Sequence, residues 1–124
     1  MRVMIFVKAT ADSEAGGPPS PEMLDAMVAF NQKLIDAGVL VDAAGLKPTA
    51  HAVRVAFDGA SRTVIPGPFN AVSELVSGFW IWEVKDLDEA VAWVKQCPNP
   101  MPGPSEIEIR PFYEMADIAK WRTP

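Results

Sequence analysis

Cysteine, histidine and tyrosine are nearly absent from the chain, since each occurs once among 124 residues. With Cys97 as the lone thiol, no disulfide can form within the chain, which fits a reducing compartment. With His51 as the lone imidazole, no His/Cys metal cluster can be built within one chain. A glycine-rich phosphate-binding motif is also missing. We therefore expect no metal, no cofactor and no internal disulfide.

Basic residues are few and scattered. Eleven Lys and Arg stand against sixteen Asp and Glu, which gives a formal net charge of −5, and only Lys120 and Arg122 lie close together. Proteins that bind nucleic acid usually carry a basic stripe. No apolar run approaches the roughly 18 residues of a membrane span, and the run before Lys8 is too short for a secretory signal. The sequence predicts a cytoplasmic protein whose partners include neither nucleic acid nor membranes.

Hydrophobic residues make up 49% of the chain and charged residues 22%, which excludes a disordered protein. Twelve prolines exclude a long helix or a coiled coil. The length predicts one domain over residues 1–124, with a core over 1–111 and a tail over 112–124.

The first part of the chain has the pattern of a strand, a loop, a helix and a strand. Residues 2–8 are apolar on both faces, as in a central strand, and the glycines, prolines and serines of 11–21 predict a long loop. Ser20 followed by Pro21 predicts a helix start, and Gly38 its end. Residues 39–46 predict the second strand. The predicted apolar stripe of the helix has one polar member: Leu24, Met27, Val28, Asn31, Leu34 and Ile35.

The second part repeats this pattern after an insertion. Residues 51–57 and 62–65 flank Asp58-Gly59 and predict a hairpin, and residues 70–75 predict a short helical turn. Residues 77–84 predict a strand, 86–97 a helix capped by Asp86, and 106–110 a last strand. This order predicts an α+β fold, a ferredoxin-like βαββαβ sandwich with an inserted hairpin.

Two helices can cover only one face of such a sheet, yet two of the predicted strands are apolar on both faces. In the strand over 77–84, Trp80 and Trp82 alternate with Phe79 and Ile81, and the alternation leaves open which pair faces the helices. The sheet of a partner chain, packed face to face, is the simplest cover, so we expect a homodimer.

Six short segments, taken in their order and spacing, carry a family resemblance. They are Ala37-Gly38-Val39-Leu40, Gly45-Leu46, Gly67-Pro68-Phe69, Gly78-Phe79-Trp80, Asp86-Leu-Asp-Glu-Ala90 and Glu108-Ile-Arg-Pro111. From Met1 to about Pro111 the sequence resembles the YCII-related superfamily, in the branch named for an Asp-Gly-Pro-Phe (DGPF) motif. The resemblance implies a dimeric α/β-barrel in which two ferredoxin-like units pair their sheets.

The chain departs from the family pattern at two places. Pro66 stands where the naming motif has its aspartate. Some relatives carry a histidine on the first helix and an aspartate after the second, proposed as a catalytic pair. Here the helix position holds Met27 and the later segment reads Gln96-Cys97-Pro98-Asn99. We therefore assign no catalytic residue, and whether the protein is an enzyme stays open.

Four residues are the candidate ligand contacts: Met27, Asn31, Arg54 and Phe69. A buried amide needs hydrogen-bond partners, so Asn31 either braces the sheet or faces a polar cavity. Arg54 either is solvated or points into a cleft to hold an anion. By contrast, we expect His51 at the surface and Cys97 buried. We expect Glu106, Glu108 and Arg110 on a solvated strand face, and the tryptophans in the core or the dimer.

The function predicted from these residues is binding or transformation of a small, largely apolar organic molecule. The expected site is a cleft between the first helix and the sheet, bordered by residues 11–21. The resemblance also implies kinship with barrels that include monooxygenases, isomerases and dehydrochlorinases. The alternative that it implies is a non-enzymatic regulatory or interaction protein associated with sigma-factor-linked transcription. An enclosed pocket with Asn31 or Arg54 pointing inward favours the ligand, whereas an exposed apolar patch favours a protein partner.

Overall fold

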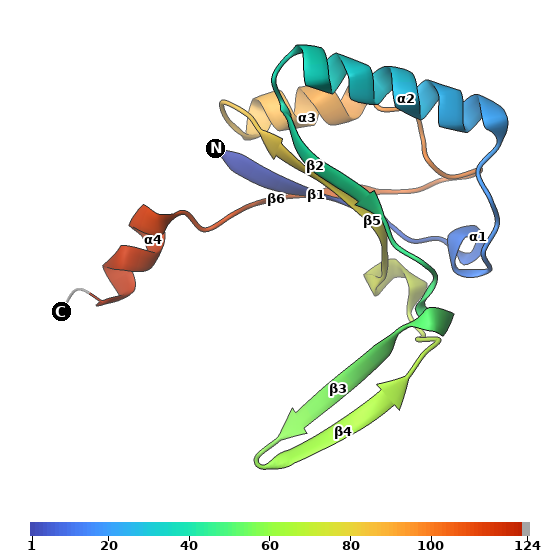
Figure 1. Ribbon diagram of the computed structural model, residues 1–124, viewed down its shortest axis with the longest axis vertical. Helices are drawn as coiled ribbons and strands as arrows, with labels where there is room; N and C mark the ends of the chain where they lie inside the picture. Colours follow the sequence, from blue (N-terminus) through green and yellow to red (C-terminus); the bar gives the residue numbers. More distant parts are fainter. Residues whose placement is uncertain (123–124) are drawn as a thin grey trace.

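The computed structural model describes residues 1–122, and its centre is a four-stranded antiparallel sheet in the order β2-β5-β1-β6 (Figure 1). The strands are β1 (Arg2–Lys8), β2 (Leu40–Gly45), β5 (Val76–Glu83) and β6 (Ile107–Pro111). Ile5 lies opposite Trp80 on one side and Ile109 on the other. The prediction that residues 2–8 form a central strand is therefore confirmed.

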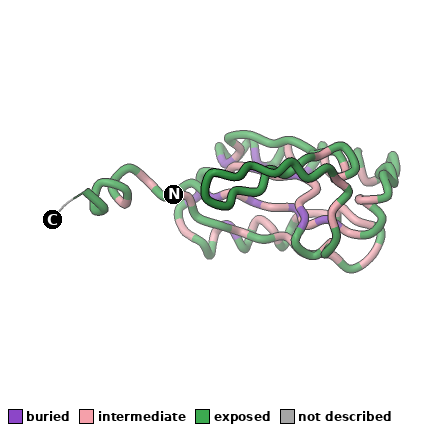
Figure 2. Tube along the Cα trace, turned by 90° about the horizontal axis from the view of Figure 1, so that it is seen from below, coloured by how far each residue is buried: buried purple, intermediate pink, exposed green. Residues whose placement is uncertain are grey.

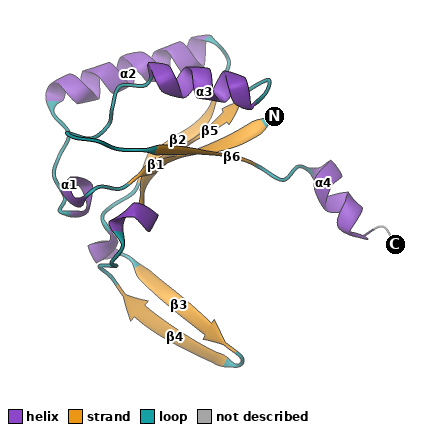
Figure 3. Cartoon of the chain, turned by 180° about the vertical axis from the view of Figure 1, so that it is seen from behind, coloured by secondary structure: helices purple, strands orange, loops and turns teal. Residues whose placement is uncertain are grey.

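Two helices, α2 (Pro21–Asp36) and α3 (Leu87–Gln96), cover one face of this sheet (Figures 1 and 3). The Ser20 hydroxyl accepts a hydrogen bond from the Met23 amide at 3.1 Å, and the Asp86 carboxylate accepts one from Glu89 at 2.9 Å. Each cap satisfies an amide that the first helical turn leaves free. Gly38 at φ +72° takes the left-handed conformation that follows α2. Both predicted helix starts are confirmed, and the protein is α+β.

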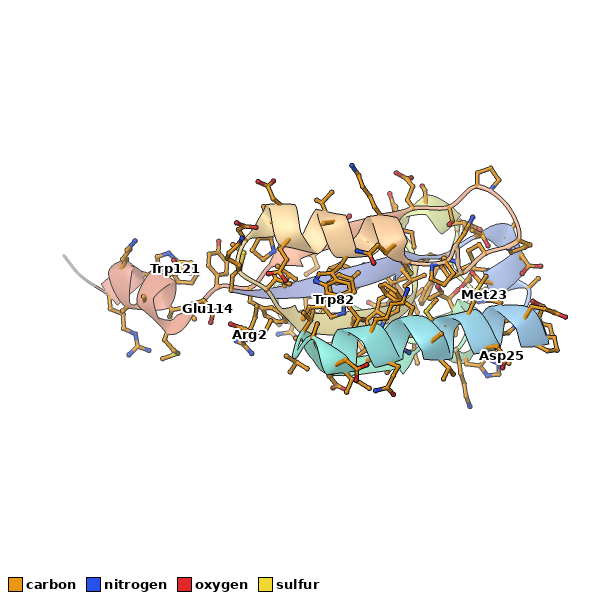
Figure 4. All side chains as sticks on the ribbon, turned by 90° about the horizontal axis from the view of Figure 1, so that it is seen from above. Arg2, Met23, Asp25, Trp82, Glu114 and Trp121 are labelled. Atoms are coloured by element: carbon orange, nitrogen blue, oxygen red, sulfur yellow. The ribbon has the colours of Figure 1, made fainter. Side chains whose placement is uncertain are left out.

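The core lies between the helices and the sheet. Val3, Ile5, Leu34 and Trp82 are completely buried, and Trp82 lies between α2 and α3 in Figure 4. The alternation in β5 is thereby resolved. Trp80 and Trp82 face the helices, whereas Phe79 and Ile81 are half-buried on the helix-free face.

The predicted stripe of the first helix is partly wrong. Val28 is 68% exposed and Ile35 is 53% exposed, whereas Phe30 is buried. The ring centroid of Phe30 lies 6.0 Å from that of Trp80 and 6.3 Å from that of Trp82. Rings at such distances attract each other and exclude a large apolar area from water. The three-ring cluster therefore sets the rotation of α2, which the periodicity along the helix alone did not show.

The predicted loop over residues 11–21 contains a short helix, α1 (Ala11–Glu14). The Thr10 hydroxyl accepts a hydrogen bond from the Ser13 amide, and the Ser13 hydroxyl accepts one from the Thr10 amide. This reciprocal capping box starts a helical turn at Ala11, and the glycines and prolines that follow Ala15 end it. The prediction of a long loop over residues 11–21 is therefore wrong for residues 11–14.

The inserted hairpin is formed by β3 (Val53–Asp58) and β4 (Ser61–Pro66). It leaves the sheet on the side opposite the helices (Figures 1 and 3), and in Figure 2 it is exposed along its whole length. The tail carries α4 (Met115–Ala119), and Figure 4 shows Glu114 near Arg2 with Trp121 beyond it. The last two residues of the predicted tail, 123–124, lie outside the described residues.

Three 3-10 turns complete the order of elements: Thr49–His51, Val72–Glu74 and Lys120–Arg122. The second confirms the helical turn predicted within residues 70–75. Across residues 1–122, no helix combines the length and the apolar character needed to cross a membrane.

Candidate ligand cavity

A cavity of about 890 Å³ lies between α2 and the part of the sheet formed by β2 and β5. Met23, Met27 and Asn31 line it from α2, and Ser77 and Trp80 line it from β5. Its rim comes from α1 and the loop after it, within residues 12–20, and from two further loops, within residues 46–48 and 100–102. The cavity is thus bounded by two rigid elements and bordered by irregular chain, an arrangement typical of ligand sites.

Asn31 is the polar side chain that α2 contributes to this cavity, and Trp80 fixes its orientation. The indole Nε1 of Trp80 donates a hydrogen bond to Asn31 Oδ1 at 2.9 Å. Because an indole N–H can only donate, the amide oxygen must face it. The amide nitrogen of Asn31 makes no hydrogen bond to an acceptor within residues 1–122. The NH₂ group therefore remains available to a molecule in the cavity.

The wall beside Asn31 is largely apolar and adaptable. Met23, Met27 and Met101 bring three thioethers to the lining, and Leu24 and Leu46 add branched side chains. Methionine is unbranched and polarizable, so it fits ligands of irregular shape. Such a wall favours an apolar ligand body, while the Asn31 amide supplies one directional contact.

The charged groups of the lining lie on its rim. Glu14 accepts hydrogen bonds from the Thr49 amide at 3.1 Å and from the Thr49 hydroxyl at 2.5 Å, so both its oxygens have partners. Asp12 and Lys47 are exposed. The rim therefore carries two carboxylates, Asp12 and Glu14, against one ammonium, Lys47.

The four predicted contacts fall into two separate pairs. Met27 and Asn31, one helical turn apart, both line the cavity. Arg54 and Phe69 lie at the base of the hairpin, where the Arg54 guanidinium is 3.8 Å from the centroid of the Phe69 ring. Neither residue of this second pair lines the cavity. The structure thus engages Arg54 in a cation–π contact.

Several lining segments were not among the predicted contacts. They include Lys47-Pro48 and the run Pro100-Met101-Pro102, two segments that lie far apart in the sequence. Their proline content was visible in the sequence and marks them as loops, but no local pattern places two such loops at one site. Trp80 was predicted in the core or the dimer interface, and its bond to an α2 amide 49 residues away carries no sequence signature.

The YCII-related domain family matches residues 1–115. The chain belongs to the YCII-related domain family. An uncharacterized protein of Rhizobium meliloti (strain 1021) is 31% identical over 84 residues, which is 68% of this chain and 68% of the relative.

The nucleophile and base candidates of this YCII-related chain lie away from the cavity lining. Cys97 is half-buried at the end of α3, and burial raises the pKa of its thiol from 9.0 to about 11. It therefore stays protonated at neutral pH, when a nucleophilic cysteine needs a lowered pKa. His51 is exposed in its 3-10 turn. Over residues 1–122, no group of three or more His, Cys, Asp or Glu side chains could hold a metal ion.

Proposed function

We propose that this YCII-related protein binds a small, largely apolar organic molecule that carries a hydrogen-bond-accepting oxygen. The Asn31 amide carries the proposal, because Trp80 fixes its oxygen and leaves its NH₂ group beside an apolar wall. A cavity of about 890 Å³ falls within the roughly 300–1,000 Å³ typical of small-molecule sites.

The oriented amide gives the site a means of selection. A ligand with a carbonyl oxygen at Asn31 would satisfy the free N–H donors, whereas a hydrocarbon of the same shape would leave them unpaired in an apolar surrounding. A site built to hydrogen-bond a ligand rejects the analogue that lacks the matching group. The methionines would then select the shape of the ligand, and Asn31 would select ligands with an accepting oxygen.

Binding is the part of the predicted function that the lining residues support. Acid–base transformation would need a proton-transfer group in contact with the ligand. His51 and Cys97 lie outside the lining, and both oxygens of Glu14 are engaged by Thr49. Asp12 is the other carboxylate of the lining, and it lies exposed on the rim.

A titration followed by ¹H–¹⁵N NMR tests the proposal with matched probes. Acetophenone offers a carbonyl oxygen, and cumene has nearly the same shape without one. We expect acetophenone to shift the Asn31 side-chain amide and Trp80 indole resonances and to bind about 10-fold more tightly than cumene, a difference of about 1.4 kcal/mol.

Two variants complete the design. Asn31→Leu should abolish the preference for the ketone, whereas Gln32→Leu, which removes an exposed amide next to it on α2, should preserve it. Equal binding of both probes by the wild type, or no shift of the Asn31 and Trp80 resonances with either probe, would contradict the proposal.

The assembly predicted above is a second proposal. We infer that the sheet is ferredoxin-like and pairs with the same sheet of a second chain, as in a DGPF-type dimeric α/β-barrel. The strand order, the placement of both helices on one face, and the half-buried Phe6, Phe79 and Ile81 on the other face support this. Light scattering at low micromolar concentration should give twice the 13.5 kDa chain mass, and a folded monomer would contradict the pairing.

Two features of the sequence support the remaining parts of the proposal. The segment Gly67-Pro68-Phe69 supports the DGPF branch, and the lone cysteine supports a cytoplasmic location.

The regulatory alternative rests on one observation, the exposed apolar hairpin. Such a surface suits a protein partner. Suppose that the wild-type protein recovered a sigma factor in a pull-down, that the Val64→Asp variant did not, and that light scattering showed a monomer. This result would favour the regulatory alternative over self-association.

A further inference from the structure

The hairpin presents one apolar face to solvent. In the β3–β4 register Val55 lies opposite Val64, and Val53 and Phe57 lie two residues to either side of Val55, so the four side chains share a face. They are 49–72% exposed. The opposite face carries residues such as Arg54, Ala56 and Thr63, with Ile65 as its one large apolar side chain. The alternation is that of a strand pair with one buried side, yet within the single chain that side is uncovered.

The base of the hairpin is closed by hydrogen bonds and joined to α1 through Thr49. The Gly67 amide donates to the Ala52 carbonyl at 2.9 Å, and the Phe69 amide donates to the Thr49 hydroxyl at 3.0 Å. That hydroxyl in turn donates to Glu14, on the rim of the cavity. A side chain at Gly67 would overlap the Thr49 carbonyl oxygen, so the chain passes closely here. The hairpin therefore leaves the molecule as an arm from a closed base that Thr49 joins to α1.

An isolated two-stranded hairpin is at best marginally stable in water. An arm that bares four large apolar side chains therefore needs a surface that covers them. Its apolar face holds one charged residue, Arg62 near the tip. The Arg62 guanidinium lies 4.4 Å from the centroid of the Phe57 ring and donates to the carbonyls of Gly59 and Ser61. Because this cation is already engaged, the face is suited to an apolar protein surface and lacks the basic cluster that an anionic membrane or nucleic acid would require.

We propose that the apolar face of the hairpin docks on a second copy of this chain, as an extension of the dimer proposed above. The hairpin leaves the sheet on its helix-free side, the side where the partner's sheet would lie (Figure 1). The partner would receive it and return its own hairpin by twofold symmetry.

The area of the interface supports a second copy as the occupant. The helix-free sheet face alone offers few fully exposed side chains, since Met4, Phe6, Phe79 and Ile81 are all half-buried. The four hairpin side chains are 49–72% exposed, and at roughly 100 Å² each they offer on the order of 400 Å². Because each chain would also cover the hairpin of its partner, each would contribute on the order of 800 Å², the area that one partner contributes to a standard stable interface.

The test compares two charge substitutions on neighbouring residues of β4. Val64→Asp places a carboxylate on the apolar face, and Thr63→Asp places the same charge on the opposite face. Analytical ultracentrifugation should show that Val64→Asp raises the dimer dissociation constant about 100-fold and that Thr63→Asp leaves it within a few-fold of the wild-type value. Circular dichroism should show both variants folded, because both positions are exposed in the single chain.

Isotope-filtered NMR on a mixture of labelled and unlabelled chains gives the second readout. We expect NOEs from the Val55 and Val64 methyl groups of one chain to protons of the other. Dimers of equal strength in both variants, without such NOEs, would overturn hairpin docking and leave sheet pairing in place. A folded wild-type monomer at low micromolar concentration would overturn both. Hairpin-dependent binding of a lysate protein or a vesicle to that monomer would identify a different occupant and equally contradict the proposal.

Discussion

The hydrogen bond between Trp80 and Asn31 predicts an energetic coupling that a double-mutant cycle can measure. Trp80 is only 5% exposed, so the Asn31→Leu substitution would leave its indole N–H, now bonded at 2.9 Å, with no protein acceptor. An unsatisfied buried donor costs about 1–3 kcal/mol. In a Trp80→Phe background no N–H remains to be orphaned, so the same Asn31→Leu substitution should cost less by at least about 1 kcal/mol.

Urea unfolding followed by circular dichroism, at one fixed protein concentration, measures the four corners of this cycle. With slopes of about 1–3 kcal/mol per molar urea, Asn31→Leu should lower the midpoint by about 1 M in the wild-type background. Gln32→Leu is the control, and its exposed position predicts a change within about 0.5 kcal/mol. Equal costs of Asn31→Leu in both backgrounds would refute the coupling and with it the fixed orientation of the amide.

Further predictions concern the core, the thiol and metal content. Leu34→Ala should lower the free energy of unfolding by about 2–5 kcal/mol, whereas Ile35→Ala, at the next and half-exposed position, should cost under about 1 kcal/mol; equal costs in urea unfolding would refute the rotation of α2. The folded Cys97 thiol holds its proton up to a pKa of about 11, so stability should fall as pH rises from 9 towards 11, and Cys97→Ser should remove that part of the slope; parallel wild-type and variant curves would contradict it. Elemental analysis of dialysed protein should find no stoichiometric zinc or iron, and one metal per chain would refute the prediction. If an activity is found, His51→Ala should leave kcat largely unchanged, because His51 lies outside the cavity lining. A loss of about 100-fold or more, typical of the removal of a general base, would contradict this.

Local signals in the sequence predicted the elements well. Ser20 and Asp86 cap their helices as expected, and the hairpin turns at Asp58-Gly59, where Gly59 has φ +55°. Such signals work because a cap or a turn is made by residues within a few positions of one another. The capping box of Thr10 and Ser13 is equally local, but the helix that it starts has only four residues. The glycines and prolines that follow favoured the prediction of a loop.

The rest of the site depends on contacts between distant parts of the chain. Periodicity allowed Val28 and Phe30 alike to face inward, and the packing of Phe30 on Trp80 and Trp82 decided between them. Asn31 could either brace the sheet or face a cavity, and in the structure it does both, through its oxygen and its position in the lining. Arg54 and Phe69 were predicted beside the same ligand, but the direction of the hairpin keeps them at its base. No pattern within one strand or helix encodes that direction.

A crystal structure of the protein soaked with acetophenone tests the proposed ligand site most directly. We expect the ketone in the cavity between α2 and the sheet, its oxygen about 3 Å from Asn31 Nδ2 and its ring against Met23 and Met27. A ketone bound there with its oxygen turned away from Asn31, or bound only elsewhere on the protein, would contradict the assignment of the cavity as a site that selects an accepting oxygen.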